Sequence, residues 1–311
     1  MGYWQHKRVL VTGGGGFIGL HLVTRLLEEG ARVRVAENFE RGTAVGLARL
    51  GHRIELVEGD LCEQAVCWRT CRDIEVVFHL AAKVGSSEFY RRFPADVVLH
   101  NLLLDAQLLQ AVRRCHVGRY LYVSSAFVYP IERQQDPDGA PIKEDEAHPA
   151  SPANSYGWAK LMAEKALEYA VDQDGELSGA IVRFSNIYGP HQSLELERGS
   201  IIPVLIRRAI EYPRLKPFFI HGSGQETRTY CYVSDAVEAM LRAVEKLDQY
   251  RLVGPLNIGG EEPIRVIELA RKIIALSGKD IELVMKPAPP PPNSKPDLGL
   301  FQGASDIGVA T

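Results

Sequence analysis

The fold is decided by residues 8–19, which read RVLVTGGGGFIG. The apolar run 9–11 predicts a buried strand and the apolar spacing over 18–29 predicts a helix, so the four glycines form the turn between them. Two overlapping patterns fit the dinucleotide fingerprint: Gly14-x-Gly16-x-x-Gly19 and its variant Gly13-x-x-Gly16-x-x-Gly19. Glycines let the backbone approach a pyrophosphate at the positive N-terminus of the helix. The position of this pattern after the first strand favours a cofactor site over an ordinary glycine-rich turn.

The alternation of strands and helices continues beyond this unit. Short apolar runs predict strands at 32–36, 54–57, 76–78, 120–123 and 180–182, and helical spacing predicts helices at 96–114 and 155–170. Because hydrophobicity within the strands is continuous rather than alternating, both faces of the sheet should be covered. The sequence therefore predicts an α/β fold with a doubly wound parallel Rossmann sheet.

Prolines interrupt the sequence after about residue 190 and predict a smaller, mixed C-terminal substrate lobe. We expect residues 1–185 and 229–262 to form the dinucleotide-binding Rossmann domain, and residues 186–228 and 263–311 to form the lobe. Residues 287–292, PAPPPP, cannot form a helix or a central strand and predict an extended connector.

Composition narrows the class of partner. The 311 residues are 46% hydrophobic and 24% charged, close to the average of globular proteins. Lys and Arg number 36 against 39 Asp and Glu, which gives a formal net charge of -3. Without a global basic field, we expect neither a nucleic acid nor an anionic membrane as a partner.

The cysteines and the N-terminus predict the compartment. Five cysteines, at positions 62, 67, 71, 115 and 231, lack the paired spacing of a zinc ribbon and the density of a secreted disulfide framework. We interpret them as buried thiols in a reducing compartment, with no metal site. The N-terminus shows no apolar signal segment, and no apolar run approaches the roughly 18 residues of a membrane span. We therefore expect a cytoplasmic protein.

An acidic residue occupies the position expected to face a cofactor ribose. Glu37 ends the second predicted strand, 18 residues after Gly19, where a carboxylate accepts from ribose hydroxyls and repels a 2′-phosphate. This favours NAD over NADP. The alternatives are a solvated loop carboxylate, or a phosphate admitted by the nearby Arg34 and Arg41.

Two further candidate segments lie at the C-terminal ends of predicted strands, where an open α/β sheet binds its ligand. They are Asp60 with Leu61, and Leu80-Ala81-Ala82.

A catalytic pair is predicted at Tyr156 and Lys160, which lie four residues apart and so share one face of the helix 155–170. A tyrosine with a pKa near ~10 is a poor base at neutral pH, but an adjacent ammonium and a nicotinamide cation stabilise its phenolate. Ser125 follows the strand 120–123 and brings a hydroxyl to the same sheet edge, where it can orient a reacting oxygen. The alternative is an exposed surface pair.

Six ordered motifs cover nearly the whole chain: Thr12-Gly13-x-x-Gly16-Phe17-Ile18-Gly19, Leu80-Ala81-Ala82, Ser125-x-x-Val128-Tyr129, Tyr156-x-x-x-Lys160, Arg183-Phe184-x-Asn186-x-Tyr188-Gly189-Pro190 and Gly222-x-Gly224-x-x-Thr227-Arg228. Together they resemble the extended short-chain dehydrogenase/reductases, in particular the NAD-dependent nucleotide-sugar epimerases and dehydratases. A narrower resemblance, to GDP-L-fucose synthases and GDP-mannose 3,5-epimerases, rests on Ala81-Ala82-Lys83-Val84-Gly85, Phe93-Pro94-Ala95-Asp96, Val128-Tyr129-Pro130, Tyr188-Gly189-Pro190-His191 and Ser294-Lys295-Pro296-Asp297.

The resemblance implies roles for the catalytic residues and the cofactor site. Ser125 contacts the sugar, Tyr156 is the base, and Lys160 lowers the pKa of the tyrosine and holds the cofactor ribose. The implied NAD-binding set is Gly13, Gly16, Phe17, Ile18, Gly19, Glu37, Asp60, Leu61, Leu80, Ala81 and Ala82, together with Tyr156 and Lys160.

The resemblance also implies a substrate and an assembly. The substrate is a nucleotide-diphosphate sugar, the assembly is a homodimer, and the substrate contacts include Lys83 and Ser125. Asn186 faces the sugar phosphate and Arg228 binds the diphosphate, for which a guanidinium fork is well shaped. The alternative for Arg228 is an ordinary surface arginine.

The sequence departs from the resembled families at informative positions. The 3,5-epimerising families place a cysteine two residues before the tyrosine matched by Tyr129, as half of an acid/base pair, and here that residue is Phe127. The other half is matched by His191, for which a loop histidine is the alternative. The dehydratases carry acidic residues where this sequence has Ala126 and Phe127, so dehydration is not expected. Relatives continue past the Lys-Pro-Asp segment into a helix, whereas this sequence ends at Thr311.

We therefore expect a nucleotide-sugar epimerase that uses NAD to oxidise C4 of the sugar transiently, with Tyr156 as the base. A C4 reductase or dehydrogenase with net cofactor turnover is one alternative. A dinucleotide-binding sensor without catalysis is another, but it would not need a phenolate beside the nicotinamide. The nucleotide base and the sugar are left open.

Overall fold

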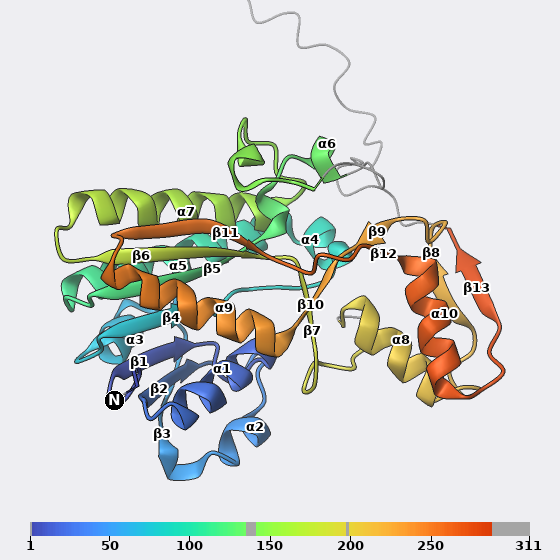
Figure 1. Ribbon diagram of the computed structural model, residues 1–311, viewed down its shortest axis with the longest axis horizontal. Coiled ribbons are helices and arrows are strands. Elements are labelled where there is room, and N and C mark those ends of the chain that lie inside the picture. Colours follow the sequence, from blue (N-terminus) through green and yellow to red (C-terminus); the bar gives the residue numbers. More distant parts are fainter. Residues whose placement is uncertain (1, 135–140, 197–198, 288–311) are drawn as a thin grey trace, which may run out of the picture.

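The computed structural model describes residues 2–134, 141–196 and 199–287 as a helix-covered sheet with a smaller lobe at one end (Figure 1). The sheet has seven strands in the order β3-β2-β1-β4-β5-β6-β11, and all neighbours are parallel. The strands are β1 (Arg8–Thr12), β2 (Arg32–Glu37), β3 (Ile54–Glu58), β4 (Val76–His79), β5 (Arg119–Ser125), β6 (Ser178–Phe184) and β11 (Leu252–Ile258). The predicted doubly wound Rossmann sheet is confirmed.

The order of the strands reverses between β1 and β4, which pair with Thr12 opposite His79. In an open α/β sheet the ligand binds outside the carboxyl ends of the strands at such a switch point. The C-terminal ends of β1, β4 and β5 therefore define where a functional site is expected.

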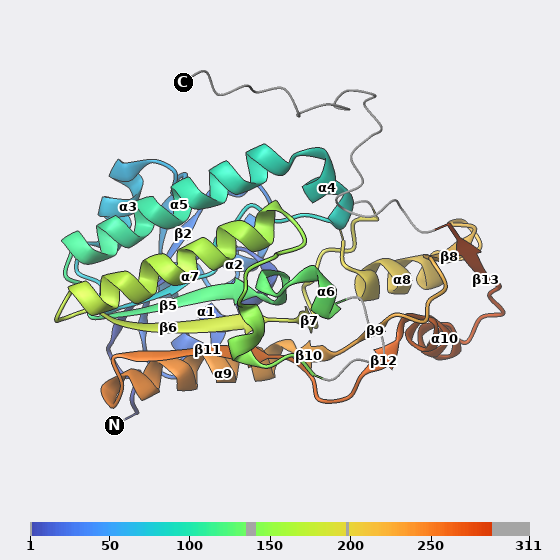
Figure 2. The same cartoon turned by 90° about the horizontal axis from the view of Figure 1, so that it is seen from above.

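Helices cover both faces of the sheet (Figure 2). One face carries α1 (Phe17–Glu28), α2 (Ala44–Ala48) and α9 (Val233–Glu245), whose apolar side chains join one core with β1, β2 and β6. The other face carries α3 (Gln64–Cys71), α5 (Pro94–Arg114) and α7 (Ser155–Gln173) around a second core. Among the described residues, no helix is both long and apolar enough to cross a membrane.

The expectation that all strands are covered on both faces is wrong for β3. This strand lies at the edge of the sheet, and Glu55 and Leu56 are exposed. As the edge strand, β3 pairs only with β2 among the described strands, so one side of it has no neighbouring strand there. The cysteines also differ in part from the prediction, because Cys62 and Cys115 are only half-buried, while all five remain free thiols.

The smaller lobe has its own core, built from α8 (Ile201–Ile210), β8 (Phe218–His221), α10 (Val266–Ser277) and β13 (Leu283–Lys286). Strands β8 and β13 are parallel, whereas β9 (Thr227–Arg228) and β12 (Ile264–Arg265) are antiparallel, which agrees with the predicted mixed lobe. The exact domain boundaries stay a prediction. The predicted connector after Pro287 and the Ser294–Asp297 motif lie outside the described residues.

Short elements join the two parts. Strands β7 (Asn186–Tyr188) and β10 (Tyr230–Tyr232) form a parallel pair where the chain leaves and re-enters the Rossmann core. The remaining short helices are α4 (Ser87–Arg92), α6 (Ile131–Gln134), η1 (Gly51–Arg53), η2 (Ala126–Val128), η3 (Glu144–Ala147) and η4 (Lys246–Asp248).

Candidate active site

The glycine turn adopts the geometry that a pyrophosphate needs. Gly13 has a φ of +68°, which favours glycine, and its carbonyl accepts from Gly16 N at 3.0 Å. A Cβ at Gly19 would lie 2.2 Å from the Gly13 carbonyl oxygen, so α1 starts directly against the turn. Gly16 precedes α1 without a side-chain cap, and a Cβ at Gly16 would meet only the Gly13 oxygen, at 3.2 Å. The first N–H groups of α1, from Phe17 to Gly19, thus fit a bound phosphate group.

Glu37 is a buried residue that holds this turn, with only 7% of its surface exposed. Its Oε2 accepts from Gly15 N at 2.9 Å, and its Oε1 accepts from Asn38 N and Phe39 N at 3.0 and 3.1 Å. The alternative of a solvated loop carboxylate is therefore wrong. The carboxylate fixes the backbone of the turn and also supplies negative charge beside it.

The two arginines that could admit a 2′-phosphate are engaged elsewhere. Arg34 donates from Nη1 to the carbonyls of Thr70 and Arg72, at 2.9 and 2.7 Å, and pairs with Glu55 at 2.8 Å. Arg41 donates to the carbonyl of Val84. The contacts of Arg34 direct its guanidinium toward the end of α3 and toward β3, and that of Arg41 directs its guanidinium toward the loop after β4.

The segment after β3 carries a side-chain cluster that sequence analysis did not single out. Asp60 accepts from Cys62 N at 2.8 Å, and the Cys62 Sγ lies 3.7 and 3.8 Å from the ring nitrogens of His100. Ligand atoms of these three residues lie within 4.8 Å of one another, a spacing that a metal ion could bridge. Burial, with the neighbouring Asp60, raises the pKa of the Cys62 thiol to about 12, which opposes formation of the thiolate that a soft metal requires. Leu61 is buried and its carbonyl accepts from Cys67.

Tyr156 and Lys160 lie buried on the first turns of α7, so the alternative of an exposed pair is wrong. The Tyr156 ring stacks on Tyr90, with centroids 5.2 Å apart and planes 5° apart, and meets the edge of Phe127 at 6.2 Å. Lys160 Nζ lies 5.7 Å from the centroid of the Tyr156 ring and 4.5 Å from that of Tyr122. The side chains therefore lie close enough for the ammonium to act on the phenol.

Burial shifts both members of the pair toward their neutral forms. It raises the pKa of Tyr156 well above 10, with contributions from Tyr90 and Asp105, and it lowers the pKa of Lys160 against the opposing charges of Asp105 and Glu164. A cation placed beside Tyr156 would therefore lower the pKa of its hydroxyl strongly, because charges in a buried site are screened little by water.

Ser125 is the last residue of β5 and caps the short helix that follows it. Its Oγ accepts from Phe127 N at 3.2 Å at the start of η2. A Cβ at Gly157 would lie only 2.1 Å from the Phe127 carbonyl oxygen, so the first turn of α7 packs directly on η2. Glycine at this position thereby allows the close approach of α7 to η2, the turn whose N-cap is Ser125.

The loop after β4 lies against the glycine turn. Leu80 N and Ala81 N both donate to Thr12 Oγ1 at 3.1 Å, and a Cβ at Gly13 would lie 3.0 Å from Ala81 N. Further along, Lys83 N donates to Asn101 Oδ1 at 2.8 Å, and Lys83 Nζ lies 3.6 Å from Glu40. The predicted Leu80-Ala81-Ala82 segment therefore borders the cofactor turn.

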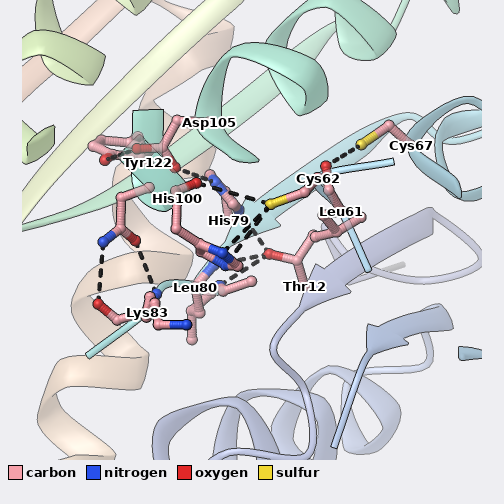
Figure 3. Close-up of polar contacts among 12 residues, drawn as sticks. Thr12, Leu61, Cys62, Cys67, His79, Leu80, Lys83, His100, Asp105 and Tyr122 are labelled. Atoms are coloured by element: carbon pink, nitrogen blue, oxygen red, sulfur yellow. Dashed lines mark hydrogen bonds and ion pairs between the residues drawn. The ribbon is translucent and has the colours of Figure 1, made fainter. Parts of the chain in front are cut away.

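A buried polar chain that was not predicted from the sequence lies beneath this site (Figure 3). Thr12 Oγ1 lies 2.7 Å from His79 Nδ1, His79 Nε2 lies 2.8 Å from Asp105 Oδ1, and Tyr122 OH donates to Asp105 Oδ2 at 2.8 Å. All four residues are buried. One signal was available, since Asp105 lies on the apolar face of α5 between Leu104 and Leu108, where a carboxylate needs partners.

Comparison with known proteins shows which family this chain belongs to. The model described as "NAD dependent epimerase/dehydratase family" matches residues 9–259. The chain belongs to the NAD-dependent epimerase/dehydratase family. It is therefore an enzyme of this family, and the prediction of NAD as the cofactor is confirmed at the family level.

The curated relatives of this protein include two classes of enzyme. The GDP-mannose 3,5-epimerase 1 of Oryza sativa subsp. indica is 29% identical, over 92% of this chain and 74% of its own. The UDP-glucuronic acid decarboxylase 6 of Arabidopsis thaliana is 32% identical, over 95% of this chain and 82% of its own. The first agrees with the narrower resemblance noted in the sequence.

Solved structures of the family are similar over the whole fold. The UDP-glucose 4-epimerase of Thermotoga maritima with UDP-glucose has a TM-score of 0.79 at 29% identity, with 91% of this chain and 86% of that chain covered. The UDP-glucose 4-epimerase of Thermus thermophilus in complex with NAD has a TM-score of 0.78 at 28% identity, with 91% and 88% covered.

The remaining predicted substrate residues of this family member lie toward the small lobe. Asn186 is exposed and donates to the carbonyl of Thr229 at 3.0 Å, and Arg228 is exposed with Nη1 on the carbonyl of Thr227 at 2.7 Å. His191 is exposed at a φ of +67°, and its ring lies 5.6 Å from that of His21 on α1. The ring of His191 thus lies near α1, whereas the ring of Tyr156 packs against Tyr90 and Phe127.

Proposed function

We propose that this protein is a nucleotide-sugar epimerase that inverts its substrate through transient oxidation of C4, with Tyr156 as the base. The observation that carries the proposal is the buried Tyr156–Lys160 pair on the first turns of α7, which pack on the turn that Ser125 caps at the carboxyl end of β5. The relatives whose names specify 4-epimerisation of a UDP-sugar support it.

The residues present fit bound NAD. The uncapped start of α1 suits its pyrophosphate, and Glu37 places a negative charge beside the turn, which favours a free ribose over a 2′-phosphate. When bound, NAD would accept a hydride from the sugar and return it to the ketone. NAD(H) is accordingly the proposed cofactor in preference to NADP(H).

The chain's own residues carry the proton transfer. Lys160 stabilises the Tyr156 phenolate, which takes the proton of the C4 hydroxyl, while the Ser125 hydroxyl orients the reacting oxygen. Tyr90 and Phe127 cover the Tyr156 ring and exclude water from this reaction. The same proton is available when the hydride returns to the ketone.

Substrate selection is proposed at the small-lobe side of the site. Asn186 and Arg228 would contact the sugar phosphate and the diphosphate, with Lys83 as a further contact, and His191 keeps its predicted role as an acid/base group. Inversion at C3 and C5 is not proposed, because the Phe127 side chain that contacts Tyr156 can neither give nor take a proton.

A homodimer is the proposed assembly. Five large apolar side chains are exposed on the outer layer of α5 and α7, which lie side by side in Figure 2. They are Leu99, Leu103, Trp158, Met162 and Tyr169. Such a patch on a two-helix layer favours burial against a second copy of the same layer.

Quantifying the cofactor released by denaturing the purified protein tests the proposed function. An epimerase regenerates its cofactor in each turnover, so we expect close to one NAD(H) per chain after extensive dialysis, and conversion of a UDP- or GDP-sugar without added cofactor. A protein that is emptied by dialysis and requires added cofactor stoichiometric with product is instead a net C4 oxidoreductase. Binding of dinucleotide with no turnover of any nucleotide sugar would favour the sensor alternative.

A further inference from the structure

The buried chain of Figure 3 has its protons fixed by its hydrogen bonds. Thr12 Oγ1 already accepts from Leu80 N and Ala81 N, so its own proton goes to His79 Nδ1. His79 Nε2 must then carry the ring proton and donate it to Asp105. Burial lowers the pKa of His79 despite the opposing charge of Asp105, which is consistent with a neutral ring.

Asp105 therefore accepts both of its hydrogen bonds from neutral groups, His79 and the hydroxyl of Tyr122. Burial alone would raise the pKa of Asp105, but the charge of Lys160 and these two hydrogen bonds outweigh it and hold the pKa below its usual value. The carboxylate is thus negatively charged, while neither hydrogen bond neutralises that charge.

Lys160 is the cation that faces this charge. Its Nζ lies 4.5 Å from the centroid of the Tyr122 ring, whose hydroxyl donates to Asp105. The ammonium, the ring and the carboxylate are therefore arranged in series in a buried region, where charges interact strongly. The charged and titratable groups around Lys160 are Asp105 from α5, His79 from β4, Tyr122 from β5, and Tyr156 and Glu164 from α7.

We propose that Asp105 is a positioning residue of the active site, whose buried negative charge keeps Lys160 protonated and so sets the pH range in which the Tyr156–Lys160 pair works. This role rests on the proposed function of that pair. It also links the pair to the cofactor turn, because the same carboxylate orients His79 and, through it, Thr12.

The pH dependence of kcat/KM in Asp105→Asn tests the proposal. The amide has the shape of the carboxylate and keeps a hydrogen bond to His79, but it lacks the charge. Loss of an anion lowers the pKa of both Lys160 and Tyr156, so both limbs of the pH profile should move to lower pH. Asp105→Glu retains the charge and should keep the limbs near their wild-type positions. A lower rate with unmoved limbs in Asp105→Asn would show a purely structural role.

A double-mutant cycle in thermal unfolding tests the charge interaction without any activity. Asp105→Asn leaves a buried Lys160 without its counter-charge, and Lys160→Met leaves a buried Asp105, so each single variant should lower Tm. The double variant should lose less than the sum of the two. Additive losses would overturn the proposed charge interaction whether or not the protein is active. Coupling in a protein that turns over no nucleotide sugar would show that the charge interaction exists and that the proposed function is what failed.

Discussion

Asp105 and Glu164 are two buried carboxylates on neighbouring helices that face the same sheet, but their charges are handled differently. Glu164 accepts from Arg183 through both oxygens, at 3.0 and 2.7 Å, and from Ser124. Asp105 accepts from neutral donors alone among the described hydrogen bonds. Both carboxylates have hydrogen-bond partners, but in the part of the chain that the structure describes only Glu164 is paired with a cation. Only such a pairing cancels the electrostatic effect of a carboxylate on more distant groups.

This difference indicates different roles for the regions around Glu164 and Asp105. The guanidinium of Arg183 also donates to Tyr129 OH at 3.1 Å and to the Glu144 carbonyl at 2.7 Å, so this pair fastens β6 to α7 and to η3. The charge of Asp105 is instead proposed to act on Lys160. The first region should therefore respond to mutation in stability and the second in activity and pH dependence.

The largest expected effect is on stability. Arg183→Met leaves the buried Glu164 carboxylate unpaired, so we expect unfolding to become easier by about 3–5 kcal/mol, measured by urea denaturation. The matched control is Arg183→Met with Glu164→Met, which removes both charges and should recover much of this loss. If the double variant were as unstable as the single one, the loss of stability would not come from the unpaired charge of Glu164, and the structural role assigned to the ion pair would be wrong.

The next effect is on catalysis. Tyr156→Phe leaves both carboxylates and their partners in place, so we expect a fall in kcat of at least ~100-fold, with cofactor binding and Tm nearly unchanged. Steady-state kinetics and thermal melting of the same sample measure this. Full activity in Tyr156→Phe would show that Tyr156 is not the base, and the proposed role of Asp105 would then fail as well.

The smallest effect concerns Glu37, a third buried carboxylate, whose partners are backbone amides. Its charge is not neutralised by a cation in these contacts, so we expect tighter binding of NAD(H) than NADP(H) and a relaxed preference in Glu37→Gln. Calorimetric titration of both cofactors measures the ratio, and Glu37→Ala separates loss of charge from loss of the contacts to the turn. Tighter binding of NADPH by the unchanged protein would contradict the assignment.

Local spacing made much of the fold predictable. The glycine turn, the helix after it and the apolar strands depend on residues close in sequence, and Tyr156 and Lys160 share a helix face because they are four residues apart. Exposure of β3 was not predictable in this way, because it depends on the strand's place at the edge of the sheet.

The sequence by itself determined a parallel sheet with a glycine turn after its first strand, and it singled out the pair proposed to be catalytic. Only the tertiary structure decided what surrounds that pair, because β1, β4, β5 and α5 meet through the order of strands in the sheet. Thr12 and His79 are 67 residues apart in sequence but are register partners, and Asp105 reaches His79 and Tyr122 from a helix on one face. The periodicity of a sequence does not predict such contacts, because they depend on which strands pair and on which polar groups become buried together.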